Sequence, residues 1–456
     1  MRVKYIYGII TLMGFLNIST AFAQDESVWT LDRCIAYAVE NNISLKRQTL
    51  ETEITQHDLR QSKLNALPDL NGQLEHNLGS GRILDRGTYE WLNTDVSQGD
   101  LGLVSNFTLF KGLQGYNNIK MSEATYNASQ SMLQLIENNL LIQIMTGYLD
   151  LLRKEELYEI AVEKVALTGK QVKRMEKLVE VGNASMGELL EVKAQASEEK
   201  YNMTIAKNQM DVSRLTLIQL LNLQDTEGFI IDRPELPDPS ALQVQSLDAV
   251  YQAALEILPQ IEGARYNIVA QEKQLAVARG AFSPEVYIRA LYYSNYSDKL
   301  VNPRDTDPMS PSMDYPVSQQ VSDNQYRQVS LGVNIPIFNK WQFRTNVSQA
   351  KIGLEDAMYQ LEDEKQQLLK EIQQYHADAL AALGKYESAL ESVTNSEEAY
   401  RYAEERYKVG TATALELEEA RNRLFQARIE QVSSKYVFVF YVKILDFYQG
   451  KGLKIE

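Results

Sequence analysis

The chain has 456 residues, a formal net charge of −15 at pH 7, one cysteine and three histidines. An acidic chain lacks the basic patches with which proteins bind nucleic acid, so these numbers argue against a nucleic-acid partner. The single cysteine, Cys34, excludes an intrachain disulfide. Because the histidines are far apart and no HExxH, CxxC or phosphate-binding glycine motif occurs, we expect no catalytic residue, no cofactor and no metal site.

The first residues have the pattern of a secretory signal. Arg2 and Lys4 precede a short apolar stretch at 6–18, and Ala21-Phe22-Ala23 is a small-x-small cleavage site. The apolar stretch is too short for a membrane-spanning helix. We therefore predict a signal peptide at residues 1–23 and an exported mature chain, with an uncleaved N-terminal anchor as the alternative.

Three helical segments are expected in the first half of the mature chain. The first covers residues 31–66, and a proline-free one follows from about 112 to 181. The latter has about 70 residues, which corresponds to roughly 105 Å of helix. A third helix is expected at 184–223, after Gly182. Because the two shorter helices together match the long one in length, they predict a hairpin with one continuous limb and one broken limb.

Two alternating segments, around residues 70–78 and 101–110, separate the first helix from the long one. Each places apolar and polar side chains on opposite faces over about 10 residues, the span of a tilted transmembrane strand. A soluble half-buried sheet would show the same alternation. The predicted export and the polar stretch at 79–100, which we expect to be a loop, favour a membrane strand.

The same pattern recurs in the second half of the chain, where the first helix is expected to run from Leu247 to about Ala281. Pro68 and Pro284 are 216 residues apart, and Gly182 and Gly410 are 228 apart, so we expect an internal repeat with a longer loop at 294–325. The stretch between the copies has three prolines and is typical of a linker. The predicted organisation is a signal peptide (1–23), a first repeat (24–224), a linker (225–246), a second repeat (247–449) and a C-terminal tail (450–456).

The second copy has the clearest periodic patterns. One alternating segment is expected around residues 286–292, with a weaker pattern, and another has its apolar residues at Val329, Leu331, Val333, Ile335 and Ile337. A second long helix is expected from about 340 to 409. Its apolar seam follows coiled-coil spacing through these residues: Leu368, Ile372, Tyr375, Ala379, Leu383, Tyr386, Leu390 and Val393.

The four predicted strands are too few to seal a barrel. Unpaired strand edges are not tolerated in lipid, where every backbone polar group needs a partner. We therefore expect the strands to be pooled between identical subunits, although the sequence alone does not specify how many.

Two matching motifs, at residues 181–191 and 407–420, resemble the tip motifs of TolC-like outer-membrane efflux proteins. The resemblance covers nearly all of the mature chain. It implies a mainly α fold with β structure: a homotrimer whose four strands per chain form a 12-stranded β-barrel in the outer membrane, continuous with a long α-helical coiled-coil barrel in the periplasm. The implied function is that of a channel, not an enzyme, which conducts substrates from the periplasm or an inner-membrane pump to the exterior.

The resemblance also assigns roles at the helix tips. The turns, which would dock a periplasmic adaptor, contain Val181, Gly182, Val409 and Gly410. The acidic residues implied in a closed gate are Glu416 and Glu419, with Glu188 and Glu191 at the equivalent first-copy positions, and Tyr407 matches a gate tyrosine. A ring of carboxylates in a narrow pore selects for cations. Acidic residues are also favoured at any helix N-terminus, so a solvated helix start is the alternative.

One position departs from the family pattern. The family's gate arginine, two residues after the second-copy glycine, is replaced here by Ala412. A polar latch of the closed state must therefore use other residues, and Lys408 is one candidate.

Two other classes of protein remain as alternatives. A periplasmic coiled-coil adaptor would carry one helical hairpin, whereas two are predicted here. An exported structural coiled coil would leave the four alternating segments unexplained. An enzyme has the least support, since no acid–base, nucleophile or metal constellation is found.

Overall fold

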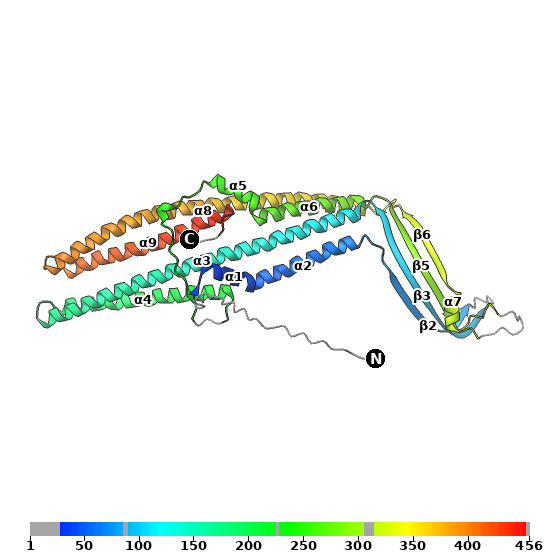
Figure 1. The fold of residues 1–456 in the computed structure, drawn as a ribbon, viewed down its shortest axis with the longest axis horizontal. Helices are drawn as coiled ribbons and strands as arrows, with labels where there is room; N and C mark the ends of the chain where they lie inside the picture. Colours follow the sequence, from blue (N-terminus) through cyan, green and yellow to red (C-terminus); the bar gives the residue numbers. More distant parts are fainter. Residues whose placement is uncertain (1–27, 85–89, 225–227, 305–313, 453–456) are drawn as a thin grey trace, which may run out of the picture.

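The computed structural model describes residues 28–84, 90–224, 228–304 and 314–452. The predicted signal peptide and the last residues of the predicted tail lie outside this range. The molecule is elongated, with a body of helices at one end and a four-stranded sheet at the other (Figure 1). Within the described residues, none of the helices combines the length and the apolar character needed to cross a membrane.

The helices of the first half form the expected hairpin. Helix α3 (Gln114–Glu180) is continuous over 67 residues, and α4 (Met186–Leu221) returns along its distal half. Helix α2 (Ile43–Leu64) packs along the half of α3 nearer the sheet, and α1 (Leu31–Asn41) lies where α2 and α4 approach each other (Figure 1). One limb is therefore continuous and the other is broken near mid-height.

The second half contains helices of almost the same lengths in the same order. Helices α5 (Leu247–Ile257) and α6 (Pro259–Gly280) have 11 and 22 residues, as α1 and α2 do. Helix α8 (Gln342–Lys408) has 67 residues, as α3 does, and α9 (Ala414–Tyr448) has 35. Helix α9 packs along α8, and α6 packs against both α3 and α8, which joins the two halves.

Each first helix is interrupted where the sequence predicted one continuous segment. Asn42 has an extended backbone, and its side chain accepts a hydrogen bond from the Leu45 amide at 3.1 Å, so it caps α2. Leu258 is also extended because Pro259 follows it at the first position of α6. The prediction of unbroken helices was therefore wrong at these two positions.

The apolar seam of α8 also differs from its predicted course in the distal half. Ala382 and Ala389 are buried, whereas Leu390 is exposed and Leu383 is only half-buried. Together with the half-buried Tyr375, the buried positions keep alternating steps of four and three residues from Leu368 to Val393. The sequence-based seam favoured the larger leucines, but small alanines occupy the contact line.

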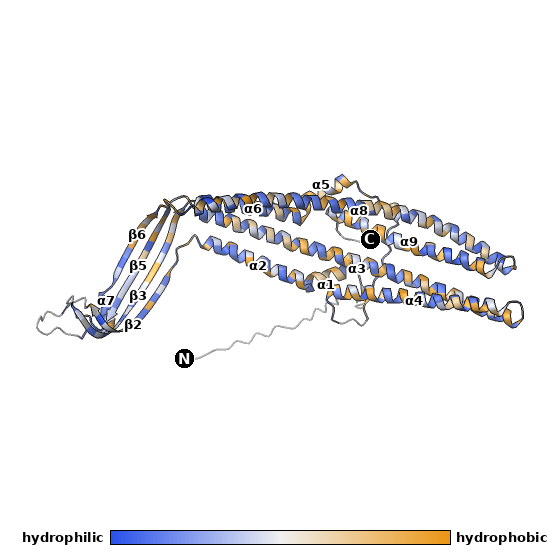
Figure 2. Ribbon diagram, turned by 180° about the vertical axis from the view of Figure 1, so that it is seen from behind, coloured by the Kyte–Doolittle hydropathy of each residue, from blue (hydrophilic) through white to orange (hydrophobic). Residues whose placement is uncertain are grey.

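The sheet consists of four antiparallel strands in the order β2–β3–β5–β6. These are β2 (Asn71–Leu84), β3 (Trp91–Lys111), β5 (Glu285–Ser297) and β6 (Tyr326–Asn334). The strands carry both hydrophobic and hydrophilic residues along their length (Figure 2). Directly paired residues share a face, and the register gives one face that is predominantly apolar. Its members include Leu74, Leu101, Leu103, Phe107, Ile288, Ala290, Tyr292, Val329, Leu331 and Val333.

The opposite face is mostly polar, as the alternation predicted, although Val104 and Leu291 also lie on it. It carries Gln73, Glu75, Asn77, Asp100, Asn106, Arg289, Gln328 and Ser330. Neither outer strand, β2 or β6, pairs with a further strand in the described part of the chain. The chain alone therefore forms an open sheet with two faces of different polarity.

The strands differ from their predicted extents. Strands β2 and β3 continue through most of the stretch 79–100 that was expected to be a loop, apart from residues outside the described range. The polar residues of this stretch predicted a loop, but the two backbones stay paired as far as Leu84 and Trp91. The Arg82 guanidinium also lies 5.6 Å from the centre of the Trp91 ring across the hairpin. The second expected loop contains the short helix α7 (Val317–Asp323). Strand β6 ends before Ile335 and Ile337, because Pro336 has no amide to donate to the ladder.

A small structure at mid-height joins the chain start to the central linker. Strand β1 (Val28–Trp29) pairs in parallel with β4 (Ile230–Ile231), just before a 3-10 turn at Pro239–Ala241. The Tyr148 hydroxyl lies 3.2 Å from the Trp29 carbonyl oxygen and 2.8 Å from that of Asp232. Burial raises the pKa of this tyrosine, so it remains a neutral donor. Residues around it, from α1, α3, α4 and the linker, belong to the largest buried cluster.

Candidate functional site

The two helical hairpins reverse direction at the end of the molecule farthest from the sheet (Figure 1). Gly182 and Gly410 have φ of 77° and 78°, a left-handed conformation that favours glycine. The amide after each glycine donates to the carbonyl oxygen five residues earlier, at 2.8 and 2.9 Å. Both turns are therefore Schellman motifs, and Val181 and Val409 are exposed at the tips.

Each returning helix begins with a capping box. The Glu188 amide donates to Ser185 Oγ at 3.2 Å, and the Ser185 amide donates to Glu188 Oε2 at 2.8 Å. Thr413 and Glu416 make the same pair of bonds, at 3.2 and 3.0 Å. Two of the four acidic residues implied in the gate thus stabilise the helix starts, and Glu416 also lies 3.8 Å from Arg406.

The other predicted gate residues lie close to these turns. Glu419 Oε2 accepts a hydrogen bond from Arg423 at 3.3 Å on the exposed side of α9. The Tyr407 ring has the Arg174 guanidinium 5.0 Å from its centre, which is a contact between the two hairpins. Lys408 binds Glu404 and Glu405 of its own helix, at 3.3 and 2.9 Å, and Ala412 lies within the α8–α9 turn.

A cavity of about 270 Å³ lies between the two hairpins just above the tips. Helices α3, α4, α8 and α9 all contribute to its wall. Tyr400 lies on this wall, and burial together with the Glu404 carboxylate raises the pKa of its hydroxyl. Other lining residues are Leu167, Lys170, Gln171, Arg174, Met175, Glu188, Glu191, Val192, Gln195, Tyr407, Leu415, Leu417 and Glu418. The structure thus brings Glu188, Glu191 and Tyr407 to one cavity.

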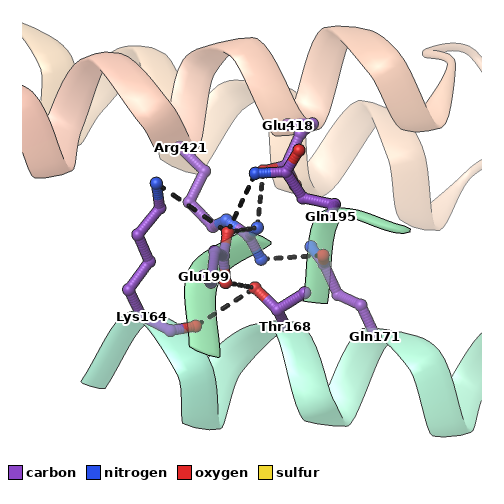
Figure 3. A network of polar contacts seen from close by, with 7 residues as sticks. All are labelled: Lys164, Thr168, Gln171, Gln195, Glu199, Glu418 and Arg421. Atoms are coloured by element: carbon purple, nitrogen blue, oxygen red, sulfur yellow. Dashed lines mark hydrogen bonds and ion pairs between the residues drawn. The ribbon is translucent and has the colours of Figure 1, made fainter. Parts of the chain in front are cut away.

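A buried polar network, drawn in Figure 3, borders the cavity, since Gln171, Gln195 and Glu418 belong to both. Arg421 of α9 has no exposed side-chain surface, and the Glu199 side chain of α4 is 1% exposed. One guanidinium nitrogen donates to Glu199 Oε1 at 2.8 Å and to Glu418 Oε1 at 2.5 Å. The other donates to Gln171 Oε1 of α3 at 2.8 Å. Arg421 therefore connects the second hairpin to both helices of the first.

The Glu199 carboxylate has further partners within the first hairpin. Gln195 donates to Oε1 at 3.3 Å, and Lys164 Nζ lies 3.8 Å from the same oxygen. The Thr168 hydroxyl hydrogen-bonds to Oε2 (Figure 3). A buried charge pair of this kind does not guarantee net stability, but removal of one partner is strongly destabilising because the other charge remains buried.

Sequence reasoning missed this network, because Arg421 and Glu199 are 222 residues apart and lie in different repeats. A signal was nevertheless present in the spacing. Leu417, Arg421 and Leu424 follow steps of four and three residues, so the arginine occupies a position of the apolar seam. A charged residue at a seam position indicates a buried partner on the facing helix.

Comparison with known families decides the identity of the chain. The family model described as "Outer membrane efflux protein" matches residues 35–223 and 250–437, which together form most of the chain. The chain belongs to this family.

Relatives and solved structures agree with the assignment. The outer membrane efflux protein BepC of Brucella suis is 20% identical over 407 residues, which is 89% of this chain and 82% of the relative. Outer membrane protein TolC of Vibrio cholerae is 18% identical over 337 residues, covering 74% of this chain and 72% of the relative. The fold is similar to that of CusC (TM-score 0.78, 18% identity, 92% of each chain) and of VceC from Vibrio cholerae (TM-score 0.77, 17% identity, 93% of this chain and 97% of that one).

The assignment confirms the predicted family, location and general role. This efflux family member is an outer-membrane protein that serves as an exit duct, and its helical part lies in the periplasm. The family is one of efflux proteins and not of enzymes. The predicted adaptor and structural coiled-coil alternatives do not account for a family match that extends over both halves of the chain.

Proposed function

We propose that three copies of this chain form one continuous duct. The observation that carries the proposal is the open sheet, whose two outer strands lack a partner within the described residues and whose faces are apolar and polar. Pairing of β2 with β6 of the next copy would remove every edge, as a strand in lipid requires. Three copies would supply 12 strands, with the apolar face toward lipid and the polar face toward the lumen.

The helical hairpins would extend this barrel across the periplasm. Residues 24–224 and 247–449 would be the two repeats, and the linker 225–246 would wrap the helices at mid-height. The exposed turns around Gly182 and Gly410 are the part farthest from the membrane, so they are the surface on which a periplasmic adaptor and its inner-membrane pump would dock. Conduction through such a duct is passive and needs no cofactor.

A gate at the tips would be held closed by Arg421 in place of the arginine that Ala412 replaces. Opening of the periplasmic end requires that the two hairpins of a subunit move apart. The contacts of Arg421 with Glu199 and Gln171 cross between these hairpins and are buried. The Arg174–Tyr407 contact crosses the same boundary nearer the tips. Both resist separation of the hairpins.

Glu416 and Glu419 would line the closed constriction with carboxylates from three subunits. Glu416 is also a capping residue of α9. An effect of its replacement could therefore come from loss of charge in the pore or from loss of the helix cap. Glutamine preserves a capping box but has no charge. Replacement of Glu416 by Gln or by Ala therefore distinguishes a charge in the pore from a helix cap.

The test is ion selectivity of the full mature chain in planar bilayers. We expect a Glu416→Gln/Glu419→Gln double variant to lose cation preference as completely as the corresponding alanine variant does. Glu430→Gln, farther along α9, serves as the matched control and is expected to retain the preference. Unchanged selectivity in the glutamine variant would remove both residues from the gate, and absence of any conductance from the wild-type protein would refute the duct.

A further inference from the structure

The cavity between the hairpins has features that neither the gate nor the barrel requires. It is formed by α3, α4, α8 and α9 near the tips, and part of its wall consists of residues of the Arg421 network. An apolar cavity of about 150 Å³ is enough for one benzene molecule. The volume of about 270 Å³ is therefore sufficient for one aromatic ring with a compact substituent.

The charges on the cavity wall favour a positive guest. Four glutamates and two basic residues line it. Glu188 is engaged in its capping box and Glu418 in the Arg421 network. Glu191 and Glu404 are therefore the carboxylates that a guest in the cavity would contact most readily. Glu404 pairs with Lys408, which has Glu405 as a second partner. Release of Glu404 to a guest therefore does not leave Lys408 without a carboxylate.

The two basic residues, Lys170 and Arg174, are outnumbered by the four carboxylates of the wall. The Arg174 guanidinium also lies over the Tyr407 ring, 5.0 Å from its centre, and is engaged in that contact. The other aromatic ring in the wall is Tyr400, a half-buried residue close to Glu404. An aromatic ring next to a carboxylate is the combination that binds organic cations, because both present negative potential.

We propose that this cavity is a binding site for small aromatic cations, held between Tyr400, Glu404 and Glu191. The aromatic body of the guest would contact Leu167, Met175 and Leu415, while its positive group would face the carboxylates. Binding itself does not depend on the proposed gate. Its consequence does: a guest that touches both hairpins favours the arrangement in which they are packed, so occupancy reduces conduction.

The binding test uses calorimetric titration of the full mature chain in detergent with benzyltrimethylammonium. Tyr400→Leu and Glu404→Gln are each expected to weaken binding roughly five- to tenfold, the usual range for a cation–aromatic contact or a screened charge. The Glu404 side chain is 41% exposed, so its replacement leaves the helix packing intact even if Tyr400→Leu perturbs it. Glu391→Gln, on the exposed side of α8, is the matched control and is expected to bind as the wild type does.

Benzyl alcohol and benzenesulfonate separate charge recognition from apolar binding. We expect neither to compete with the cation. Equal binding of benzyl alcohol and the cation, or unchanged affinity in both variants, would overturn the site. In bilayers, the cation is expected to lower wild-type conductance and to have a weaker effect on Tyr400→Leu. A duct that conducts but does not respond to the bound cation would refute only the link between cavity occupancy and conduction. A protein that never conducts would refute the proposed duct.

Discussion

Replacement of Arg421 by methionine tests the proposed latch most sharply. The substitution removes three hydrogen bonds of Arg421: those to Glu199 and Gln171, which join α9 to the first hairpin, and one to Glu418 within α9. It leaves the Glu199 carboxylate buried, with Lys164 at 3.8 Å as its remaining cationic partner. Loss of one partner from a buried ion pair destabilises a structure by about 3–5 kcal/mol. Because Lys164, Thr168 and Gln195 remain, we take the lower end of this range.

That energy applies to the closed state, in which the hairpins are packed together. If Glu199 gains access to water when they separate, a loss of about 3 kcal/mol shifts the closed-to-open ratio by roughly a hundredfold. We therefore expect Arg421→Met to raise the time-averaged conductance in planar bilayers by about two orders of magnitude, up to the fully open level. Arg421→Met/Glu199→Met removes both charges and is expected to restore much of the closed state.

Arg423 is the matched control, because it lies two residues away on the same helix and its side chain is 74% exposed. Its ion pair with Glu419 at 3.3 Å is on the surface, where such pairs contribute about 0–1 kcal/mol. Arg423→Met is therefore expected to change conductance less than about fivefold. Similar conductance of the Arg421 and Arg423 variants, both folded by circular dichroism, would show that the buried network does not hold the hairpins closed.

Three further predictions concern other parts of the molecule. Cys34 is fully buried, and burial raises the pKa of its thiol to about 12, so we expect no reaction with a maleimide at pH 7.5 until the protein unfolds; labelling of the native protein would contradict its placement in the core. Gly410→Ala is expected to destabilise the tip by about 1 kcal/mol, because the residue has a positive φ and an added Cβ would meet no other atom. The effect would be measured as faster proteolysis at the tip, and Gly410→Asn is expected to destabilise it less. Leu331→Arg, on the apolar face of β6, is expected to make the free energy of assembly in the outer membrane less favourable by about 2–4 kcal/mol. Ser330→Arg, on the polar face, is expected to assemble as the wild type does, and equal assembly of the two variants would contradict the assigned faces.

The long helices and their turns were predictable because strong local signals specify them. No proline interrupts either 67-residue helix. Two residues after each helix end comes a glycine with positive φ, and the next helix starts with a capping box. Alternation also gave the two faces of the sheet, because side chains on a strand point to opposite sides in turn. These features depend on residues that are close together in the sequence.

Features that depend on distant contacts were missed. The pairing of β1 with β4 joins residues about 200 positions apart, and each of these strands has only two residues. The hairpin of β2 and β3 extends beyond its apolar part because the two backbones continue to pair. The network around Arg421 joins three helices, and its hydrogen-bond partners cannot be identified until the packing of the two hairpins is known.

The proposed duct requires that identical neighbours complete the open sheet of each chain. Electron cryo-microscopy of the detergent-extracted mature protein measures this directly, because it resolves the number of chains and the pairing of β2 with β6 of the adjacent copy. We expect a hollow trimer with 12 paired strands and a helical tube that narrows at the Gly182 and Gly410 turns. Compact single chains, or a sheet that closes without a neighbouring copy, would contradict it.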